Sequence, residues 1–374
     1  MKLWVPIKIL SDLKPLVAVF LFPFLSGAHP FLPHQPSESG PWFEGWYIRV
    51  TDHTAHRSFA VIGASELKPN QNSKNFSGYL SVLIQDGQGR PTQSIESFPK
   101  KTALKKYSRL GTSEEDGFVW SASEQGHITD QGIDVSIGDQ VEVKANFKKH
   151  NRHWDPYWSS WGPEGFGTFI KLIPLHWFVH SLDSPTEYQL KYKNEDGHIV
   201  EHKSIGSAHI EKNWGKAFPK AWMWLQGYDV ESGASLALAG GILSLGPFNI
   251  KTYLVGYKSK KVNADFQIGQ LFDANFQDKI DPCRGQYILE ASNGEYLMKL
   301  KASADPKSFG TVSIPTENGY KSHGGMESFS AEIDVEIYQN SWIQKSFQKN
   351  LLVEKRKITR AALEFGAEYM KCQK

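Results

Sequence analysis

Cysteine is scarce in this chain, because Cys283 and Cys372 are the only two among its 374 residues. Two distant thiols cannot form a zinc–thiolate cluster, which needs several cysteine or histidine ligands at close spacing. A single disulfide between them is compatible with passage through the secretory pathway, and so are two free thiols.

An excess of charge of one sign is also missing. The chain has 42 Lys and Arg residues against 40 Asp and Glu residues, for a net charge of +2, and that surplus lies in residues 1–28. No run of basic residues with interleaved aromatic residues is present. A dedicated nucleic-acid-binding protein needs a basic face that displaces counterions, so we expect no nucleic-acid partner.

Long hydrophobic runs are missing as well. The apolar run 16–25 follows a lysine-bearing stretch and is too short to span a bilayer as a helix, but it fits the core of a signal peptide. Ser26 and Ala28 suit cleavage after Ala28. We expect residues 1–28 to be a signal peptide or the first part of a targeting sequence, with a buried N-terminal helix as the alternative. No transmembrane helix is expected in the mature chain.

Several catalytic motifs are absent. The sequence contains no phosphate-binding P-loop, no Gly-x-Ser-x-Gly nucleophile motif and no His-Glu-x-x-His zinc motif. His176 and His180 would share one face of a strand, and His198, His202 and His209 follow. A metal site from these residues is one interpretation, but surface or core histidines are the favoured one, and we expect no metal.

Aromatic residues are abundant, with 12 Trp, 14 Tyr and 22 Phe. Each such side chain buries roughly 150–250 Å² of surface, so together they can build a core and line a large apolar cavity. The composition excludes a disordered chain. At roughly 150 residues per domain, the length indicates about two domains.

Short alternating segments rich in β-branched and aromatic residues, separated by Gly, Asn and Asp, predict an all-β fold. Asp196-Gly197 and Asn293-Gly294 lie between such segments and predict β-hairpins, the second pairing 286–291 with 296–301. Alternation at 362–365 favours a strand there too. The strands are expected at 47–50, 79–84, 133–137, 188–192, 252–255 and 333–337.

A weak internal repeat indicates two β-barrel or sandwich domains in tandem. Pro41 and Pro219 are each followed five residues later by a tryptophan, Trp46 and Trp224, ahead of a predicted strand. The predicted domains are 29–218 and 219–374.

Acidic residues recur beside tryptophan. Glu44 lies two residues before Trp46, Asp155 follows Trp154, and Glu211 precedes Trp214. A carboxyl group buried against apolar rings has a raised pKa and can donate a proton, and aromatic faces can stabilise the resulting cation. The simpler interpretation is that the tryptophans are core and that the acids bind backbone or face solvent.

At these segments the sequence resembles the tocopherol cyclases. Residues 43–50, Phe-Glu-Gly-Trp-Tyr-Ile-Arg-Val, are similar to that family's N-terminal signature, and 174–177, Pro-Leu-His-Trp, to its central segment. The block 211–224 resembles the family's Glu-Lys-Asn-Trp-Gly…Phe-Pro…Trp-x-Trp pattern almost throughout. The resemblance extends from about Pro41 to the last predicted strands.

This resemblance implies two lipocalin-like antiparallel β-barrels, akin to carotenoid hydratases. The implied reaction closes the ring of a prenylated hydroquinone, with a phytyl or geranylgeranyl chain, to a chromanol without any cofactor. A buried acid protonates the prenyl alkene, and the neighbouring phenol oxygen attacks the tertiary carbocation. The implied partner is a hydrophobic prenyl lipid, with peripheral contact to lipid bodies or a membrane surface.

The candidate proton donors are Glu211 and Glu44, with Asp155 as third choice. Tyr47 and five tryptophans are expected to shape the pocket, while His176 and Asn213 orient the phenol or the acid. The tryptophans are Trp46, Trp177, Trp214, Trp222 and Trp224.

Two other functions stay open: a secreted lipocalin-like protein that binds a prenyl lipid without turnover, and a hydratase in which water captures the cation. The leader predicts entry into the secretory pathway, to the outside of the cell or the endoplasmic reticulum lumen. A plastid reached through a bipartite targeting sequence is the alternative.

Overall fold

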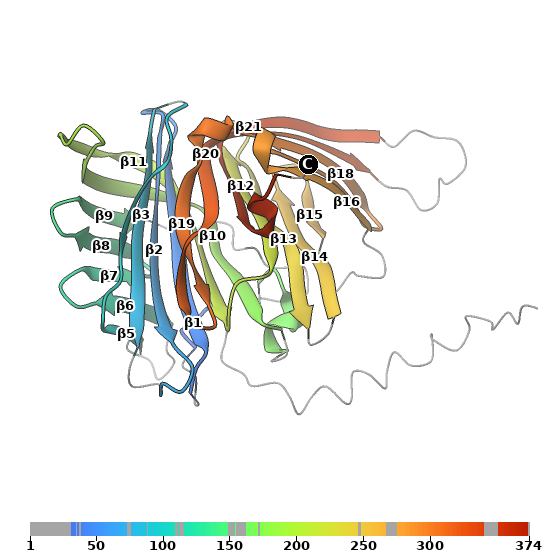
Figure 1. The fold of residues 1–374 in the computed structure, drawn as a ribbon. Coiled ribbons are helices and arrows are strands. Elements are labelled where there is room, and N and C mark those ends of the chain that lie inside the picture. Colours follow the sequence, from blue (N-terminus) through green and yellow to red (C-terminus); the bar gives the residue numbers. More distant parts are fainter. Residues whose placement is uncertain are drawn as a thin grey trace, which may run out of the picture.

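Two curved antiparallel β-sheets make up the protein in a computed structural model, with their inner strands side by side (Figure 1). Residues 31–372 are described, apart from 35, 37–38, 73–75, 88, 109–110, 112–115, 149–153, 155–161, 171–172, 246–247, 267–274 and 340–350. The predicted targeting segment 1–28 lies outside the described residues. The all-β prediction is confirmed.

The first sheet holds eleven strands in the order β4-β3-β2-β1-β11-β10-β9-β8-β7-β6-β5. A short 3-10 helix, η3 (Gly165–Phe169), precedes β10. The strands are β1 (Trp42–Asp52), β2 (Arg57–Leu67), β3 (Ser77–Asp86), β4 (Gln93–Ser97), β5 (Thr102–Tyr107), β6 (Gly117–Ala122), β7 (Gly126–Thr129), β8 (Gly132–Ile137), β9 (Val141–Phe147), β10 (Leu175–Lys193) and β11 (Ile199–Gly215).

The second sheet follows the order β15-β14-β13-β12-β21-β20-β18-β17-β16, and β19 pairs with β20 beside this path. Its strands are β12 (Ala221–Asp229), β13 (Ala234–Leu245), β14 (Phe248–Lys258), β15 (Asn263–Phe266), β16 (Asn275–Asp281), β17 (Gln286–Ser292), β18 (Tyr296–Ser303), β19 (Gly310–Thr316), β20 (Gly319–Gln339) and β21 (Leu351–Ala367). Its 3-10 helices are η5 (Pro282–Arg284), η6 (Pro306–Ser308) and η8 (Glu368–Met370).

The sequence signals for individual strands and hairpins agree with this arrangement. Strands cover all six predicted segments, and β17 pairs with β18 across Asn293-Gly294 as expected. Gly197, between β10 and β11, has φ +80°, which is the left-handed conformation that the Asp-Gly turn requires. The alternating segment 362–365 lies in β21.

Alternation along β1 serves two layers of packing at once. Trp46, Ile48 and Val50 point into the core of the first sheet. Tyr47 points the other way, into an apolar cluster shared with residues of the second sheet such as Trp224 and Phe329. Because successive side chains of a strand alternate faces, one strand thus lines both its own core and the contact between the sheets.

The repeated Pro…Trp segments occupy equivalent places in the two sheets. Each opens a strand, β1 or β12, that pairs with the next strand and with the last strand of its own sheet. The matching tryptophans nevertheless face different ways, because Trp46 packs in the first core and Trp224 between the sheets. The predicted boundary at 218/219 falls in the connection between β11 and β12.

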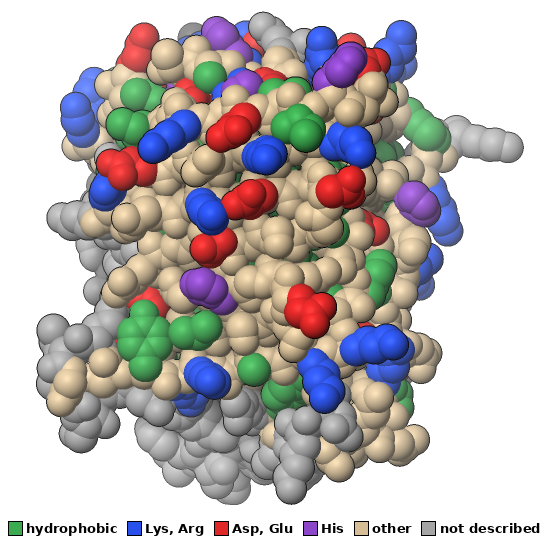
Figure 2. Space-filling view, turned by 90° about the vertical axis from the view of Figure 1, so that its left-hand side faces the viewer, with side chains coloured by type: hydrophobic (Ala, Val, Ile, Leu, Met, Phe, Trp, Pro, Cys, Tyr) green, Lys and Arg blue, Asp and Glu red, His purple; other side chains and the backbone are tan. Residues whose placement is uncertain are grey.

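Charges of both signs are mixed on the face shown in Figure 2, with Lys and Arg side chains next to Asp and Glu side chains. The described part of the chain contains no helix with the length and hydropathy that a membrane span requires.

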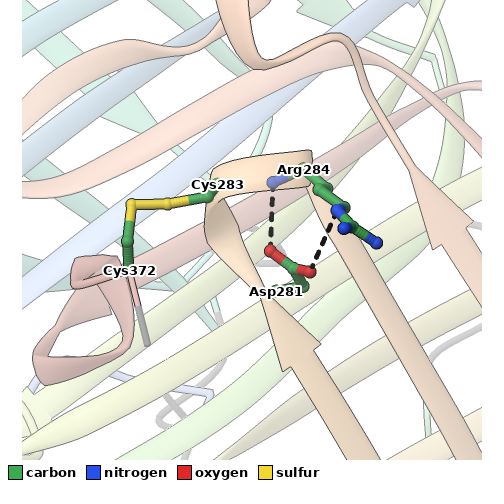
Figure 3. The surroundings of a disulfide bond; sticks show 4 residues. All are labelled: Asp281, Cys283, Arg284 and Cys372. Atoms are coloured by element: carbon green, nitrogen blue, oxygen red, sulfur yellow. Dashed lines mark hydrogen bonds and ion pairs between the residues drawn. A yellow bond between two sulfur atoms is a disulfide. The ribbon is translucent and has the colours of Figure 1, made fainter. Parts of the chain in front are cut away.

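The two cysteines form a disulfide between η5 and the segment after η8 (Figure 3), with their Cα atoms 5.5 Å apart. The Asp281 carboxylate caps η5 by accepting a hydrogen bond of 3.1 Å from the Arg284 backbone N–H. The disulfide therefore ties the end of β21, through η8, to the outer strands β16 and β17.

Removing this disulfide is expected to destabilise the fold. The bond closes a loop across a separation of 89 residues, so the Cys283→Ser/Cys372→Ser variant should lose about 2–5 kcal/mol of unfolding free energy. Urea unfolding of the variant and the oxidised wild type measures the loss. Identical unfolding midpoints would contradict the expectation.

Candidate active site

A cavity of about 160 Å³ lies between the two sheets. That space is many times the 10–15 Å³ that one water needs, so an organic ligand can enter it. The first sheet contributes Tyr47, Ile62 and Trp177, and the second contributes Trp222, Trp224 and Leu254. The lining is mostly apolar and aromatic, as small-molecule sites usually are.

Four carboxyl groups line this cavity: Glu164, which precedes η3, and three from strands, Glu211 of β11, Glu327 of β20 and Glu364 of β21. Glu327 and Glu364 are direct partners across the β20–β21 ladder, so their side chains lie on the same face of the sheet. Glu364 is also opposite Trp224 on β12. Antiparallel pairing therefore gathers acids that are far apart in the sequence.

The surroundings of Glu327 and Glu364 favour the protonated form of both carboxyl groups. Burial, reinforced by the neighbouring Glu364 carboxyl, raises the pKa of Glu327 well above its usual range. Burial likewise raises the pKa of Glu364 to about 7, against a hydrogen bond from Trp222 and with help from the charge of Glu211. Because Glu327 and Glu364 are direct cross-strand partners, ionising both carboxyl groups costs free energy through the repulsion of their charges.

Each of these two acids is oriented by an aromatic donor. The Tyr47 hydroxyl donates to Oε1 of Glu327 at 2.5 Å, and the Trp222 indole N–H donates to Oε1 of Glu364 at 2.9 Å. Glu327 is fully buried, whereas Glu364 keeps some accessible surface. Both acids line the cavity, so Glu364, with its accessible surface, is the better placed of the two to meet a ligand.

The placement of the Trp222 ring depends on a glycine. A Cβ atom at Gly366 would lie 1.9 Å from the Trp222 ring, so only glycine allows the indole to lie against β21. This close approach brings Trp222 to Glu364, two residues earlier on the same strand.

Glu211 occupies the opposite wall of the cavity. It is paired with Tyr47 across the β1–β11 ladder and is 3% exposed. Its Oε2 atom accepts a hydrogen bond from the Trp224 indole N–H at 3.1 Å and lies 2.8 Å from Nε2 of His209. Of the two predicted donors that the structure describes, Glu211 lines the cavity and Glu44 does not.

Glu44 lies on the other face of β1, away from the cavity lining. Its carboxylate is 2.7 Å from the Lys212 ammonium and also contacts the backbone N–H and the ring of His34. Burial opposes ionisation, but Lys212 and His34 outweigh it and lower the pKa of Glu44. The structure therefore shows an ion pair here instead of the expected protonated acid beside Trp46.

Lys212 completes this buried ion pair. Burial lowers its pKa to about 8, although Glu44 opposes the shift. Its ammonium lies 5.6 Å from the Trp46 ring centre and 4.9 Å from that of Trp214. The two tryptophans thus pack against a lysine, so Glu44, Lys212 and the rings act as one structural unit.

The other predicted site residues divide between the cavity and this unit. Five of them line the cavity: Tyr47, Trp177, Asn213, Trp222 and Trp224. Trp214 instead stacks on the rings of His34 and His176.

The remaining predicted residues have other surroundings. His176 is 2.7 Å from the Glu164 carboxylate and does not line the cavity. Trp46 bounds the cavity but stacks on Phe118 in the first core. Asp155 lies outside the described residues.

Among the described residues, no group of three or more His, Cys, Asp or Glu side chains comes together in a way that could hold a metal ion. His180 packs against Phe31 and Phe118, and His202 lies 3.0 Å from the Asp86 carboxylate.

Sequence reasoning missed Glu327 and Glu364. Neither has a tryptophan nearby in the sequence, because their aromatic neighbours come from β1 and β12. The alternation at 362–365 did carry a usable signal: it places a lone acid, Glu364, on the face opposite Leu363 and Phe365, which lie in the core.

Comparison with known proteins now bears on this site. The profile of the family described as tocopherol cyclase-like matches residues 40–367, and with them the whole cavity. The chain belongs to the tocopherol cyclase-like family. A relative from Oryza sativa subsp. japonica, named "Probable tocopherol cyclase, chloroplastic", is 24% identical over 257 residues, which are 57% of this chain and 53% of the relative. The chain thus matches about half the length of that relative.

Solved structures also resemble the chain. The crystal structure of CghA has a TM-score of 0.57 at 10% identity and covers 93% of this chain and 99% of its own. The kievitone hydratase from Nectria haematococca has a TM-score of 0.46 at 12% identity, with 92% and 96% covered. The likeness to CghA supports the two-sheet fold.

Stability should depend on pH through Glu364. Because its pKa is raised to about 7 in the folded protein, the free energy of unfolding should fall as pH rises from about 4.5 to 7. Glu364→Gln should therefore be more stable than the wild type at pH 8, on the order of 2 kcal/mol, and much closer to it at pH 4. Glu317→Gln, at an exposed turn, is the control. A wild type that gains stability over this range relative to Glu364→Gln would contradict the assignment.

The tocopherol cyclase-like fold should depend on the Glu44–Lys212 pair. Glu44→Gln leaves a buried ammonium without its carboxylate and should cost about 3–5 kcal/mol in denaturant unfolding. Glu44→Leu/Lys212→Met, which removes both charges, should lose less. A fully stable Glu44→Gln protein would show that the pair is not structural.

Proposed function

We propose that this protein closes the ring of a prenylated hydroquinone to a chromanol, with Glu364 as the proton donor. The observation that carries the proposal is a carboxyl group with a pKa of about 7 that lines an apolar, tryptophan-walled cavity. Such a group is partly protonated at neutral pH and can act as a general acid there. Membership of the tocopherol cyclase-like family supports this chemistry.

The reaction begins with proton transfer from Glu364 to the prenyl alkene. A C–H bond forms at the less substituted carbon, and the tertiary carbon becomes a cation. Trp222 and Trp224, whose indole N–H groups bind carboxyl groups, present rings that can stabilise positive charge. The neighbouring phenol oxygen then attacks the cation and closes the ring.

The apolar lining of the cavity favours ring closure over addition of water. Apolar side chains such as Leu254, Val312 and Ile314 line it together with the aromatic rings. A cation formed among such groups meets few waters, so the phenol oxygen of the same molecule is its favoured nucleophile. The proposed substrate is thus a hydrophobic molecule that carries its nucleophile with it.

Delivery from a lipid surface is part of the same proposal. Leu243 lines the cavity and is paired with Ile250 on β14, which is 44% exposed, and Phe248 on that strand is 69% exposed. Exposed apolar residues beside a lipid-binding cavity suit contact with a membrane surface or lipid body. The signal peptide predicted at residues 1–28 supports the further proposal that the chain enters the secretory pathway.

Glu364→Gln should strongly reduce cyclisation. Glutamine keeps the size of the side chain but cannot transfer a proton, so kcat/KM for chromanol formation from a reduced phytyl- or geranylgeranyl-benzoquinol should fall by about 10²–10⁴. In the wild type, kcat/KM should decline as pH rises above about 7, because Glu364 loses its proton.

Chromatography of the products, under argon and without thiol reductants, measures this activity. Glu317→Gln should behave as the wild type. Full activity in Glu364→Gln would remove the donor assignment, and binding of the quinol without any turnover by the wild type would replace the enzyme with a lipid carrier. A tertiary alcohol as the main wild-type product would identify a hydratase.

A further inference from the structure

We propose that Glu211, positioned by His209, accepts the phenol proton during ring closure, so that acid and base act from opposite walls of the cavity. The inference rests on the proposed function and adds a second catalytic residue to it. Attack by a phenol releases one proton, which needs an acceptor close to the oxygen.

The two carboxyl groups come from different sheets and line the same cavity. Glu364 belongs to β21 of the second sheet and Glu211 to β11 of the first, and both line the cavity. Trp224 connects them, because it is opposite Glu364 in the ladder and donates its indole N–H to Glu211 at 3.1 Å. A flat ligand between the walls can present its alkene to one carboxyl and its hydroxyl to the other.

The remaining carboxyl groups of the cavity lining are unsuited to accept a proton. Glu327 receives the Tyr47 hydroxyl at 2.5 Å and is kept protonated by burial and by Glu364. Glu164 is 2.7 Å from the His176 ring and also receives the backbone N–H of Trp177 at 2.7 Å. Among the described residues of the lining, Glu211 is the carboxyl left for this role.

His209 holds Glu211 in place. It is 2% exposed, and its Nε2 atom lies 2.8 Å from Oε2 of Glu211, while Nδ1 has no hydrogen-bond partner among the described residues. A buried N–H without an acceptor is costly, so the proton belongs on Nε2 and is donated to Glu211. This bond orients the Glu211 carboxyl group, in the way a third group orients a catalytic base.

The proton count closes over the reaction. Glu364 gives its proton to carbon and becomes a carboxylate, the phenol oxygen bonds to the cation, and the O–H proton passes to Glu211. The product is an isomer of the substrate, and the protein is left with a proton on Glu211 instead of Glu364. Return of that proton to Glu364, directly or through solvent, restores the starting state.

Separate measurement of alkene protonation and ring closure tests this division of labour. In D₂O, Glu364 carries a deuteron and transfers it to the alkene. A cation that does not close its ring can then lose a proton back to Glu364, which leaves deuterium in the prenyl chain of the recovered substrate. Glu211→Gln should lower chromanol formation by about 10²–10⁴ while deuterium incorporation continues, so the ratio of exchange to closure rises. Glu364→Gln should lose both reactions.

Two variants of His209 separate positioning from catalysis. His209→Gln keeps an N–H donor and should retain most of the closure activity, whereas His209→Leu removes it and should raise the ratio of exchange to closure. Glu211→Asp shortens the side chain and moves the carboxyl group away from the ligand, so it should also raise the ratio of exchange to closure. This variant provides the test if Glu211→Gln folds poorly.

Equal loss of exchange and closure in folded Glu211 variants, or unchanged closure, would overturn the role of Glu211 and leave Glu364 as the donor. Absence of both reactions in the wild type would instead reject the proposed function itself. Mass spectrometry of recovered substrate and product gives both readings.

Discussion

Two glutamates that directly oppose each other on adjacent strands, Glu327 and Glu364, set the character of the whole site. In water their charges would repel only weakly, but between two packed sheets the cost of ionising both is large. The fold therefore favours protonated carboxyl groups near neutral pH. The aromatic walls supply the low-dielectric surroundings that maintain this state.

The same packing separates two kinds of buried carboxyl group. Glu44, on the core side of β1, is paired with the Lys212 ammonium and stays charged, whereas Glu364 has indole and carboxyl neighbours and is partly protonated near neutral pH. Both are buried acids beside tryptophan. The difference lies in whether a cation shares the space, which decides between a structural ion pair and a group that can exchange its proton.

Much of the architecture could be predicted from the sequence, and only part of the site. Alternation and Asp-Gly or Asn-Gly turns identify strands and hairpins because these signals are local. The partners of Glu44 and Glu364 are not local: Lys212 and Trp222 lie 168 and 142 residues away. Proximity to tryptophan in the sequence therefore predicted Glu211, which lines the cavity, and Glu44, which does not. It could not indicate Glu327 and Glu364, because their tyrosine and tryptophan neighbours come from other strands.

Gly366 gives this arrangement a particular evolutionary constraint. The Trp222 ring occupies the volume that any side chain at position 366 would need. The position of Trp222 in the cavity wall thus depends on the absence of a side chain at Gly366, and any substitution there must displace the indole. A single mutation at position 366 would therefore change the shape of the cavity wall and the surroundings of the Glu364 carboxyl group together, because the Trp222 ring contacts both.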